Sequence, residues 1–134
     1  MIVLDASVVY KWIVNEDEVS TKKARAIRQR YLSGKETISA PDILLYEIGN
    51  IFGFKTKLSP IDITRAWNNF LLLEIPVVAA TPAYMSQWLK CAQKYQISIY
   101  DAAYVSLAQK RKCVFITADT KLVTRVHAPF VKSL

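Results

Sequence analysis

In the stretch MIVLDAS (residues 1–7), three branched apolar residues, 2–4, come directly before the carboxylate of Asp5. Such a run predicts a short buried strand that ends at an acid. Residues 114–117 form a second apolar run, and Asp119 follows it two positions later. In open α/β sheets, sites form beyond the carboxyl ends of the strands. The two stretches therefore predict that both acids lie at one edge of a sheet.

The rest of the chain alternates expected strands with expected helices. Further strands are expected at Thr37 to Ala40, Pro76 to Ala80 and Phe130 to Lys132. Helices are expected at Ala6 to Val14, Glu16 to Ser33, from Pro41 and Asp42 onward, at about 60–73 and 82–95, at Asp101 to Lys112, and at Asp119 to Val126. Strands separated by helices need crossover connections, so the predicted fold class is α/β, a three-layer α/β/α sandwich with a mostly parallel central sheet. The length of 134 residues predicts one domain over residues 1–134.

Four acidic residues have apolar or small neighbours: Asp5 in VLDAS, Glu47 in LLYEIGN, Asp101 in IYDAAY and Asp119 in FITADTK. Acidic side chains are usually exposed, and a buried one needs a partner. If the four converge, unit charges about 4 Å apart repel by about 4 kcal/mol at an effective dielectric near 20. A hard divalent cation such as Mg²⁺ or Mn²⁺ would compensate this repulsion, because it prefers carboxylate oxygens.

Helix capping is an alternative role for three of these acids. Asp5, Asp101 and Asp119 all stand at expected helix starts. Aspartate is a favoured N-cap there, worth about 0.5–2 kcal/mol. Glu47 lies inside the helix expected from Pro41 onward, so capping does not explain it. It is the strongest single indication of a functional carboxylate.

Other catalytic classes lack the residues that they need. His127 is the only histidine, which excludes multi-histidine zinc sites and a histidine acid–base pair. Three glycines are too few for a P-loop or a dinucleotide fingerprint, and no GxSxG elbow is present. The remaining chemistry is metal-assisted attack by water, in which bound ions activate the nucleophile and stabilise the leaving oxygen. Phosphodiester hydrolysis suits acids that are flanked by basic residues.

The net charge of +7 favours association with a polyanion. Basic residues gather in two segments. They are Lys22, Lys23, Arg25, Arg28, Arg30 and Lys35 in the first, and Lys110, Arg111, Lys112, Lys121, Arg125 and Lys132 in the second. Solvated helix faces are the alternative interpretation of each segment.

No stretch approaches the roughly 20 consecutive apolar residues that span a bilayer, so no membrane association is expected. The N-terminus lacks a basic lead and a cleavage-site pattern, and a cytoplasmic location is expected. Cys91 and Cys113 belong to no CxxC pair and are expected to be free thiols. A disulfide is the alternative if the source is a hyperthermophile.

Four stretches in order resemble the motifs of PIN-domain ribonucleases, most closely VapC-type toxins: MIVLDASVVYKW, APDILLYEIGN, SIYDAAYVSLA and FITADTKL. The resemblance runs from the first residue to about Leu122. In that family the acids hold one or two magnesium or manganese ions, which carries over to Asp5, Glu47, Asp101 and Asp119. Ser7 and Thr117 stand at the family's hydroxyl positions, where they would orient the carboxylates.

The resemblance implies a metal-dependent endoribonuclease that cuts RNA, is often a homodimer and is restrained by a cognate VapB-type antitoxin. Some members carry another acid shortly after the last motif, where this chain has Lys121. The number of metal ions stays open.

Two other functions stay open at this point. One is an RNA-binding or partner-binding module that keeps the fold without turnover. The other is a phosphatase of the aspartyl-nucleophile type, because a strand followed by DxSV resembles the opening motif of those enzymes. That chemistry needs a second acid two residues after the nucleophile, and Ser7 stands there.

Overall fold

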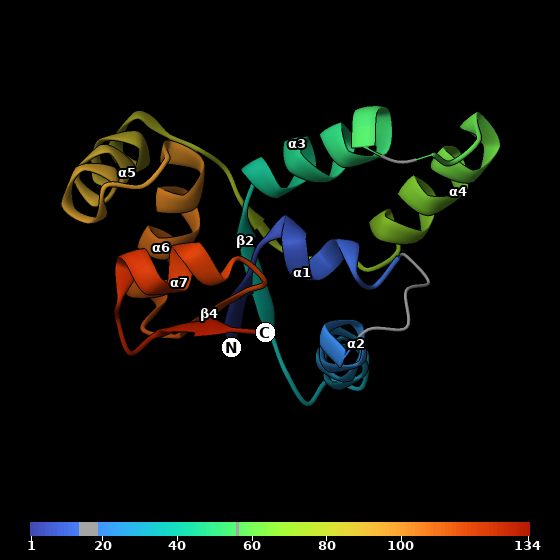
Figure 1. Ribbon diagram of the computed structural model, residues 1–134, viewed down its shortest axis with the longest axis horizontal. Helices are drawn as coiled ribbons and strands as arrows, with labels where there is room; N and C mark the ends of the chain where they lie inside the picture. Colours follow the sequence, from blue (N-terminus) through green and yellow to red (C-terminus); the bar gives the residue numbers. More distant parts are fainter. Residues whose placement is uncertain (14–18, 56) are drawn as a thin grey trace.

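The computed structural model describes residues 1–13, 19–55 and 57–134 (Figure 1). The described residues form a parallel sheet with helices packed on it. Its strands are β1 (Ile2–Leu4), β2 (Ile38–Pro41), β3 (Val77–Val78), β4 (Val114–Thr117) and β5 (Val131–Ser133). Every pair of neighbouring strands is parallel, in the order β3-β2-β1-β4-β5. The predicted α/β class with a parallel sheet is confirmed.

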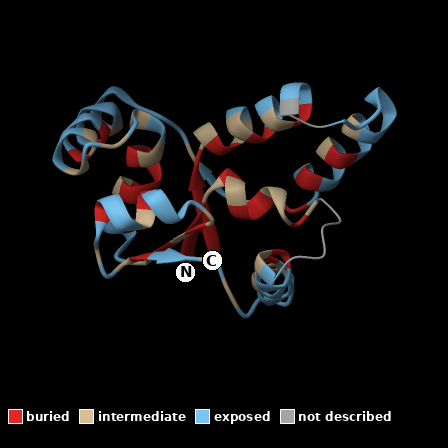
Figure 2. Ribbon diagram, in the orientation of Figure 1, coloured by how far each residue is buried: buried red, intermediate tan, exposed pale blue. Residues whose placement is uncertain are grey.

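The first strand occupies the centre of the sheet because its side chains suit burial on both faces. Val3 and Leu4 are fully buried, and Ile2 is nearly so. The register pairs Val3 with Ser39 of β2 on one side and with Phe115 of β4 on the other. Strands β1 and β2 are buried, whereas β3, most of β5 and the outer faces of the helices are more exposed (Figure 2).

The helices connect successive strands and cover the sheet. They are α1 (Ala6–Tyr10), α2 (Val19–Leu32), α3 (Ile43–Asn50), α4 (Pro60–Leu71), α5 (Pro82–Tyr95), α6 (Ile99–Arg111) and α7 (Thr120–Val126), with a π-helical turn η1 (Ile51–Lys55) after α3. In Figure 1, α1 to α4 lie on one side of the strands and α5 to α7 on the other. Right-handed crossovers require this division, because the chain moves from β1 to β3 in one direction and from β4 to β5 in the other.

Two proline-led helices begin as the sequence predicts. Ser59 and Thr81 cap α4 and α5 by accepting the backbone N–H of the third helical residue, and proline follows each of them at the first helical position. Proline lacks a backbone N–H, but no hydrogen bond is lost at the first helical position, because an N–H there has no acceptor within the helix.

Several predicted boundaries shift by a few residues. The expected strand from Pro76 to Ala80 contains only the two residues of β3, and the last strand ends at Ser133 instead of Lys132. Helix α1 ends at Tyr10, four residues before the predicted end, and Val14 lies outside the described residues, as does the predicted start of the next helix at Glu16.

The start of α6 was predicted at Asp101, and this boundary is wrong. Ser98 is the N-cap, and the helix begins at Ile99. A serine followed three residues later by an acid is a capping box, in which the two side chains satisfy the first turn together. The acid is therefore the third helical residue and not the cap.

Cys91 and Cys113 are both free, as expected. Among the described residues, no helix has both the length and the apolar character that crossing a bilayer requires.

Candidate active site

The carboxyl ends of β1 and β4 lie side by side in the sheet, and the winding of the chain reverses between them. Helices that leave toward opposite faces open a crevice at such a reversal, which is where ligands bind in open α/β sheets. Asp5 follows β1 immediately, and Asp119 comes two residues after β4. Both predicted site residues therefore lie at this edge.

Asp5 combines two roles that the sequence left as alternatives. Its backbone is extended, and its Oδ1 accepts a hydrogen bond from the Val8 N–H at 3.2 Å, so it caps α1. The same Oδ1 also accepts a hydrogen bond from the Ser7 hydroxyl at 2.5 Å. Asp5 is thus held by its own helix start while its carboxylate stays at the sheet edge.

Hydroxyl groups tie the two strand ends together. Ser7 Oγ accepts the Ala118 N–H at 2.9 Å, and the buried Thr117 Oγ1 accepts the Asp119 N–H at 2.9 Å. Ser7 and Thr117 each also hydrogen-bond to the carboxylate of Asp5. This network links α1 to the loop after β4 and fixes the orientation of Asp5.

Burial raises the pKa of Asp5 above its ordinary value of 3.8. The hydrogen bonds from Ser7, Thr117 and the backbone of Val8 act in the opposite direction, but desolvation is the largest cause. The raised pKa means that burial destabilises the charged carboxylate more than these donors stabilise it.

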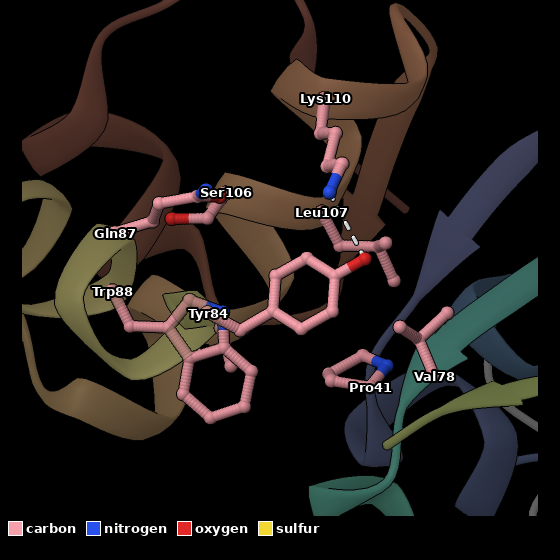
Figure 3. A pocket seen from close by; sticks show the side chains of 9 residues that line it. Pro41, Val78, Tyr84, Gln87, Trp88, Ser106, Leu107 and Lys110 are labelled. Atoms are coloured by element: carbon pink, nitrogen blue, oxygen red, sulfur yellow. Dashed lines mark hydrogen bonds between the residues drawn. The ribbon is translucent and has the colours of Figure 1, made fainter. Parts of the chain in front are cut away.

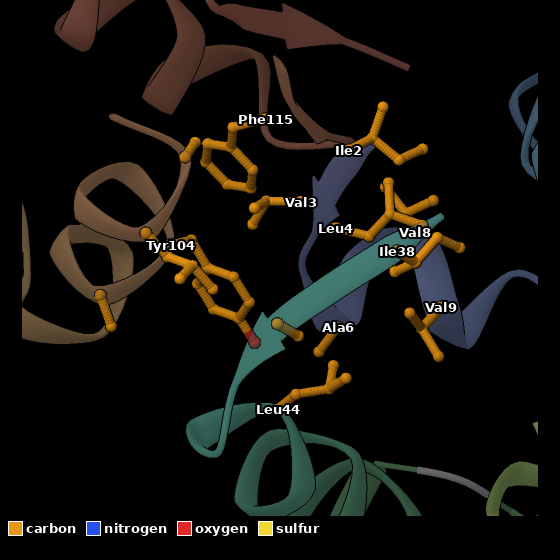
Figure 4. Close-up of a cluster of buried hydrophobic side chains, with 14 of the residues drawn as sticks. Ile2, Val3, Leu4, Ala6, Val8, Val9, Ile38, Leu44, Tyr104 and Phe115 are labelled. Atoms are coloured by element: carbon orange, nitrogen blue, oxygen red, sulfur yellow. The ribbon is translucent and has the colours of Figure 1, made fainter. Parts of the chain in front are cut away.

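Glu47 comes from α3 and is oriented by a tyrosine of α6. The Tyr104 hydroxyl donates a hydrogen bond to Glu47 Oε2 at 2.6 Å. Its ring is buried and stacks on Phe115 of β4, with centroids 5.7 Å apart and planes 6° apart. Figure 4 shows the hydroxyl at the end of the ring nearer Ala6 and Leu44, away from Phe115.

Tyr104 also connects Glu47 electrostatically with Asp5. Burial is the main reason that its pKa lies far above the ordinary value, and the negative charges of Glu47 and, less strongly, Asp5 raise it further. The phenol is therefore a neutral hydrogen-bond donor between two acids. Tyr104 is not among the site residues predicted from the sequence, although its position three residues after Asp101 on one helix was a signal.

Asp101 lies in the first turn of α6 and is hydrogen-bonded to the N-cap residue, Ser98. Ser98 Oγ accepts the Asp101 N–H at 3.1 Å and donates to Asp101 Oδ2 at 2.7 Å. Residues three apart on a helix lie on the same side, so Asp101 and Tyr104 share a face of α6. Because Tyr104 reaches Glu47 from that face, α6 turns Asp101 toward the same part of the molecule.

Asp119 is exposed and caps α7. Its Oδ1 accepts the backbone N–H groups of Lys121 at 2.8 Å and Leu122 at 3.1 Å. Its second carboxylate oxygen, Oδ2, takes part in neither bond and is available to a ligand.

The donor chemistry suits a hard divalent ion, because every candidate ligand is a carboxylate oxygen. In the residues that the structure describes, however, no group of three or more His, Cys, Asp or Glu side chains is arranged to hold a metal ion. Glu47 is bonded to Tyr104 and Asp101 to Ser98. The residues therefore fit such an ion in chemistry, but as described the structure does not gather three of them around one point.

Solved structures share the fold. The crystal structure of PAE2754 from Pyrobaculum aerophilum matches with a TM-score of 0.71 and 18% identity, over 98% of this chain and 89% of that one. The crystal structure of FitAcB from Neisseria gonorrhoeae matches with a TM-score of 0.67 and 17% identity, over 100% of this chain and 96% of that one. At such identities the likeness concerns the fold alone. A search of curated proteins found no match.

The sequence model of the PIN domain matches residues 2–127, which contain all four candidate acids. That range includes every described strand except β5. The chain belongs to the PIN domain family.

Proposed function

We propose that the protein is a Mg²⁺- or Mn²⁺-dependent endoribonuclease that hydrolyses RNA phosphodiester bonds. PIN domains are commonly nucleases, and the site supports this chemistry through one observation above all. Asp5 stands at the topological switch of the sheet, buried and bonded by the hydroxyls of Ser7 and Thr117, and burial raises its pKa. A structural cap alone would be more stable exposed to water.

The proposed ligands are Asp5, Asp101 and Asp119, with Glu47 as a further ligand or as the base that orients the attacking water. When bound, a divalent ion makes water a better nucleophile and stabilises negative charge on the phosphate. Ser7 and Thr117 hold the Asp5 carboxylate, and Tyr104 holds Glu47. Glu47 would receive a proton at Oε2 once Tyr104 releases that oxygen.

We propose the same partners that the family resemblance implies: a cognate VapB-type antitoxin, a second copy of the chain in a homodimer, and cytoplasmic RNA as substrate. The antitoxin's tail would cover the acidic edge of the sheet.

The test is cleavage of total cellular RNA by purified protein with Mn²⁺, followed by sequencing of the new 5′ ends. Cleavage at defined positions is expected, with loss of activity when a chelator is added. Asp5→Asn and Asp101→Asn are expected to remove activity and keep the fold. Asp62→Asn is the matched control, because Asp62 is an exposed acid in the first turn of α4.

Full cleavage by both site variants would reject the assigned residues. Salt-sensitive RNA binding with no cleavage under any metal would favour a non-cleaving PIN-like module. Rapid hydrolysis of a simple phosphate monoester, with no action on RNA, would favour the phosphatase alternative.

A further inference from the structure

An open groove of about 450 Å³ lies between α5 and α6. Polar and basic side chains line it: Gln87, Lys90, Lys94 and Tyr95 from α5, and Gln109 and Lys110 from α6. Cys91 and Ser106 form its floor. The two helices pack closely along this line, so the groove is part of a fixed surface.

The three lysines of the groove lack acidic neighbours. Helix α5 contains no Asp or Glu, and Asp101 is the only acid on α6. Within the described part of the chain, none of the ion pairs includes Lys90, Lys94 or Lys110. Their positive charges are therefore available to an external anion.

Aromatic side chains position two of these ammonium groups. Lys110 Nζ donates to the Tyr84 hydroxyl at 3.0 Å and lies 4.2 Å from the centroid of that ring. Lys94 Nζ lies 4.8 Å from the centroid of the Tyr95 ring, and the Tyr95 hydroxyl accepts a bond from Gln109 at 3.2 Å. A preorganised cation loses less side-chain freedom when it binds an anion.

The groove borders the carboxyl ends of β2 and β3 on one side. A small apolar pocket shares Lys110 with it and is lined also by Tyr84, Pro41 and Val78 (Figure 3). Pro41 and Val78 are the last residues of β2 and β3, and β2 pairs with β1. Strands are about 4.8 Å apart, so the end of β1 lies only about 5–10 Å from these two residues.

We infer that the α5–α6 groove binds the phosphate backbone of the RNA strand whose cleavage is proposed above, outside the cleavage site itself. The inference rests on that proposed function. Lys90, Lys94 and Lys110 contact successive phosphates, while the amides of Gln87 and Gln109 bond to phosphate or ribose oxygens. These contacts are independent of sequence, because they do not reach base edges.

RNA suits the groove better than other polyanions. A nucleic acid strand carries regularly spaced charges, and Lys90 and Lys94 are one helical turn, about 6 Å, apart along α5. An anionic membrane is flat and favours a protruding basic and apolar face, whereas these lysines line a recess. The groove also borders the carboxyl ends of β2 and β3, so a strand bound in it can extend toward the edge where phosphodiester chemistry is proposed.

The test measures binding of a fluorescent single-stranded RNA to the full protein in a chelator, so that no cleavage occurs. The groove variant replaces Lys90, Lys94 and Lys110 by Gln. The control variant replaces three other exposed lysines by Gln, namely Lys35, Lys57 and Lys132, so the net charge changes equally. A third variant, with Arg at the groove positions, keeps the charges. Thermal melting verifies that each variant is folded.

The groove variant is expected to bind about tenfold more weakly at low salt, and the slope of log Kd against log salt is expected to fall by about 2, since each single-strand contact contributes about 0.7. The control variant is expected to stay close to the wild type, and the Arg variant is expected to bind like the wild type.

If the groove and control variants lose RNA affinity equally, net charge alone explains the loss, and the inference is overturned. Unchanged binding by the groove variant, or no RNA binding by the wild type, would do the same. If labelled polyglutamate binding depends on the groove and RNA binding does not, the groove is a site for an acidic protein instead.

The outcome is separable from the proposed function. Groove-dependent binding without cleavage in Mn²⁺ would leave the inference standing and refute the nuclease. Equal RNA cleavage by wild type and groove variant, with equal affinity, would leave the nuclease standing and refute the inference.

Discussion

At the scale of single residues, Asp5 carries an unfavourable charge in the metal-free fold. Burial raises its pKa above 3.8, so at pH values between the unfolded and folded pKa the group takes up a proton on folding. The stability that it contributes is greatest below its unfolded pKa and is lost as the pH rises through the folded one. Polar groups that destabilise a fold are common at functional sites.

Asp5→Asn is therefore expected to stabilise the metal-free protein by about 0.5–2 kcal/mol at about pH 7, while cleavage is lost. Asparagine keeps the capping oxygen and has no charge to desolvate. Urea denaturation in a chelator measures the difference between variant and wild type. That difference is expected to shrink as the pH falls toward about 4, and an unstable variant at neutral pH would contradict this account.

Tyr104 acts on Glu47 through one hydroxyl. Tyr104→Phe keeps the ring that stacks on Phe115 and removes the donor 2.6 Å from Glu47 Oε2. The free energy of unfolding is expected to fall by about 1 kcal/mol. Mn²⁺ affinity, measured by titration calorimetry, is expected to weaken by about 10–100-fold, as it does when other groups that orient metal ligands are removed.

Tyr31→Phe is the control for this change. The Tyr31 hydroxyl donates to the carbonyl oxygens of Leu73 and Glu74, away from the acids. Its loss is expected to lower stability by a similar amount and to leave Mn²⁺ affinity unchanged. If both variants alter Mn²⁺ affinity equally, Tyr104 has no specific role.

At the scale of elements, the capping box at the start of α6 holds Asp101. Ser98 both caps the helix and donates to the Asp101 carboxylate. Ser98→Ala is expected to destabilise the protein by about 1 kcal/mol, as the loss of an N-cap does. It also frees the Asp101 carboxylate.

Ser59→Ala is the matched change, because Ser59 caps α4 through an equivalent pair of bonds with Asp62. Both variants are expected to lose similar stability in thermal melts, but only Ser98→Ala is expected to alter the Mn²⁺ dependence of cleavage. Identical metal dependence in the two variants would mean that Asp101 has only a capping role.

At the scale of the whole molecule, the candidate acids come from separate parts of the chain: Asp5 and Asp119 follow β1 and β4, whereas Glu47 lies in α3 and Asp101 in α6. An ion that binds all of them stabilises the folded state relative to the unfolded chain. The gain is about 2.7 kcal/mol when the ion concentration is 100 times its Kd. Mn²⁺ is thus expected to raise the melting temperature of the wild type.

The same titration with Asp5→Asn is expected to give a smaller shift, because one ligand has lost its charge. A chelator is expected to reverse the shift of the wild type. If Mn²⁺ leaves the melting temperature of the wild type unchanged at every concentration, the four acids do not form a metal site.

The sequence by itself determined the class of fold and the location of two acids. The apolar runs 2–4 and 114–117 became neighbouring strands, because branched side chains on both faces suit only a buried strand. Asp5 and Asp119 therefore had to stand at the same sheet edge. The lengths of short strands were less predictable. β3 contains only two residues, because its length depends on how much of the segment after α4 pairs with β2.

Only the tertiary structure decided how the remaining groups of the site are held. Tyr104 and Glu47 are 57 positions apart in the sequence, and no local pattern indicates that one bonds to the other. The α5–α6 groove likewise combines lysines from two helices whose packing the periodicity of neither helix specifies. Strand formation follows from local side-chain pattern, whereas contacts between elements depend on how all of the side chains pack together.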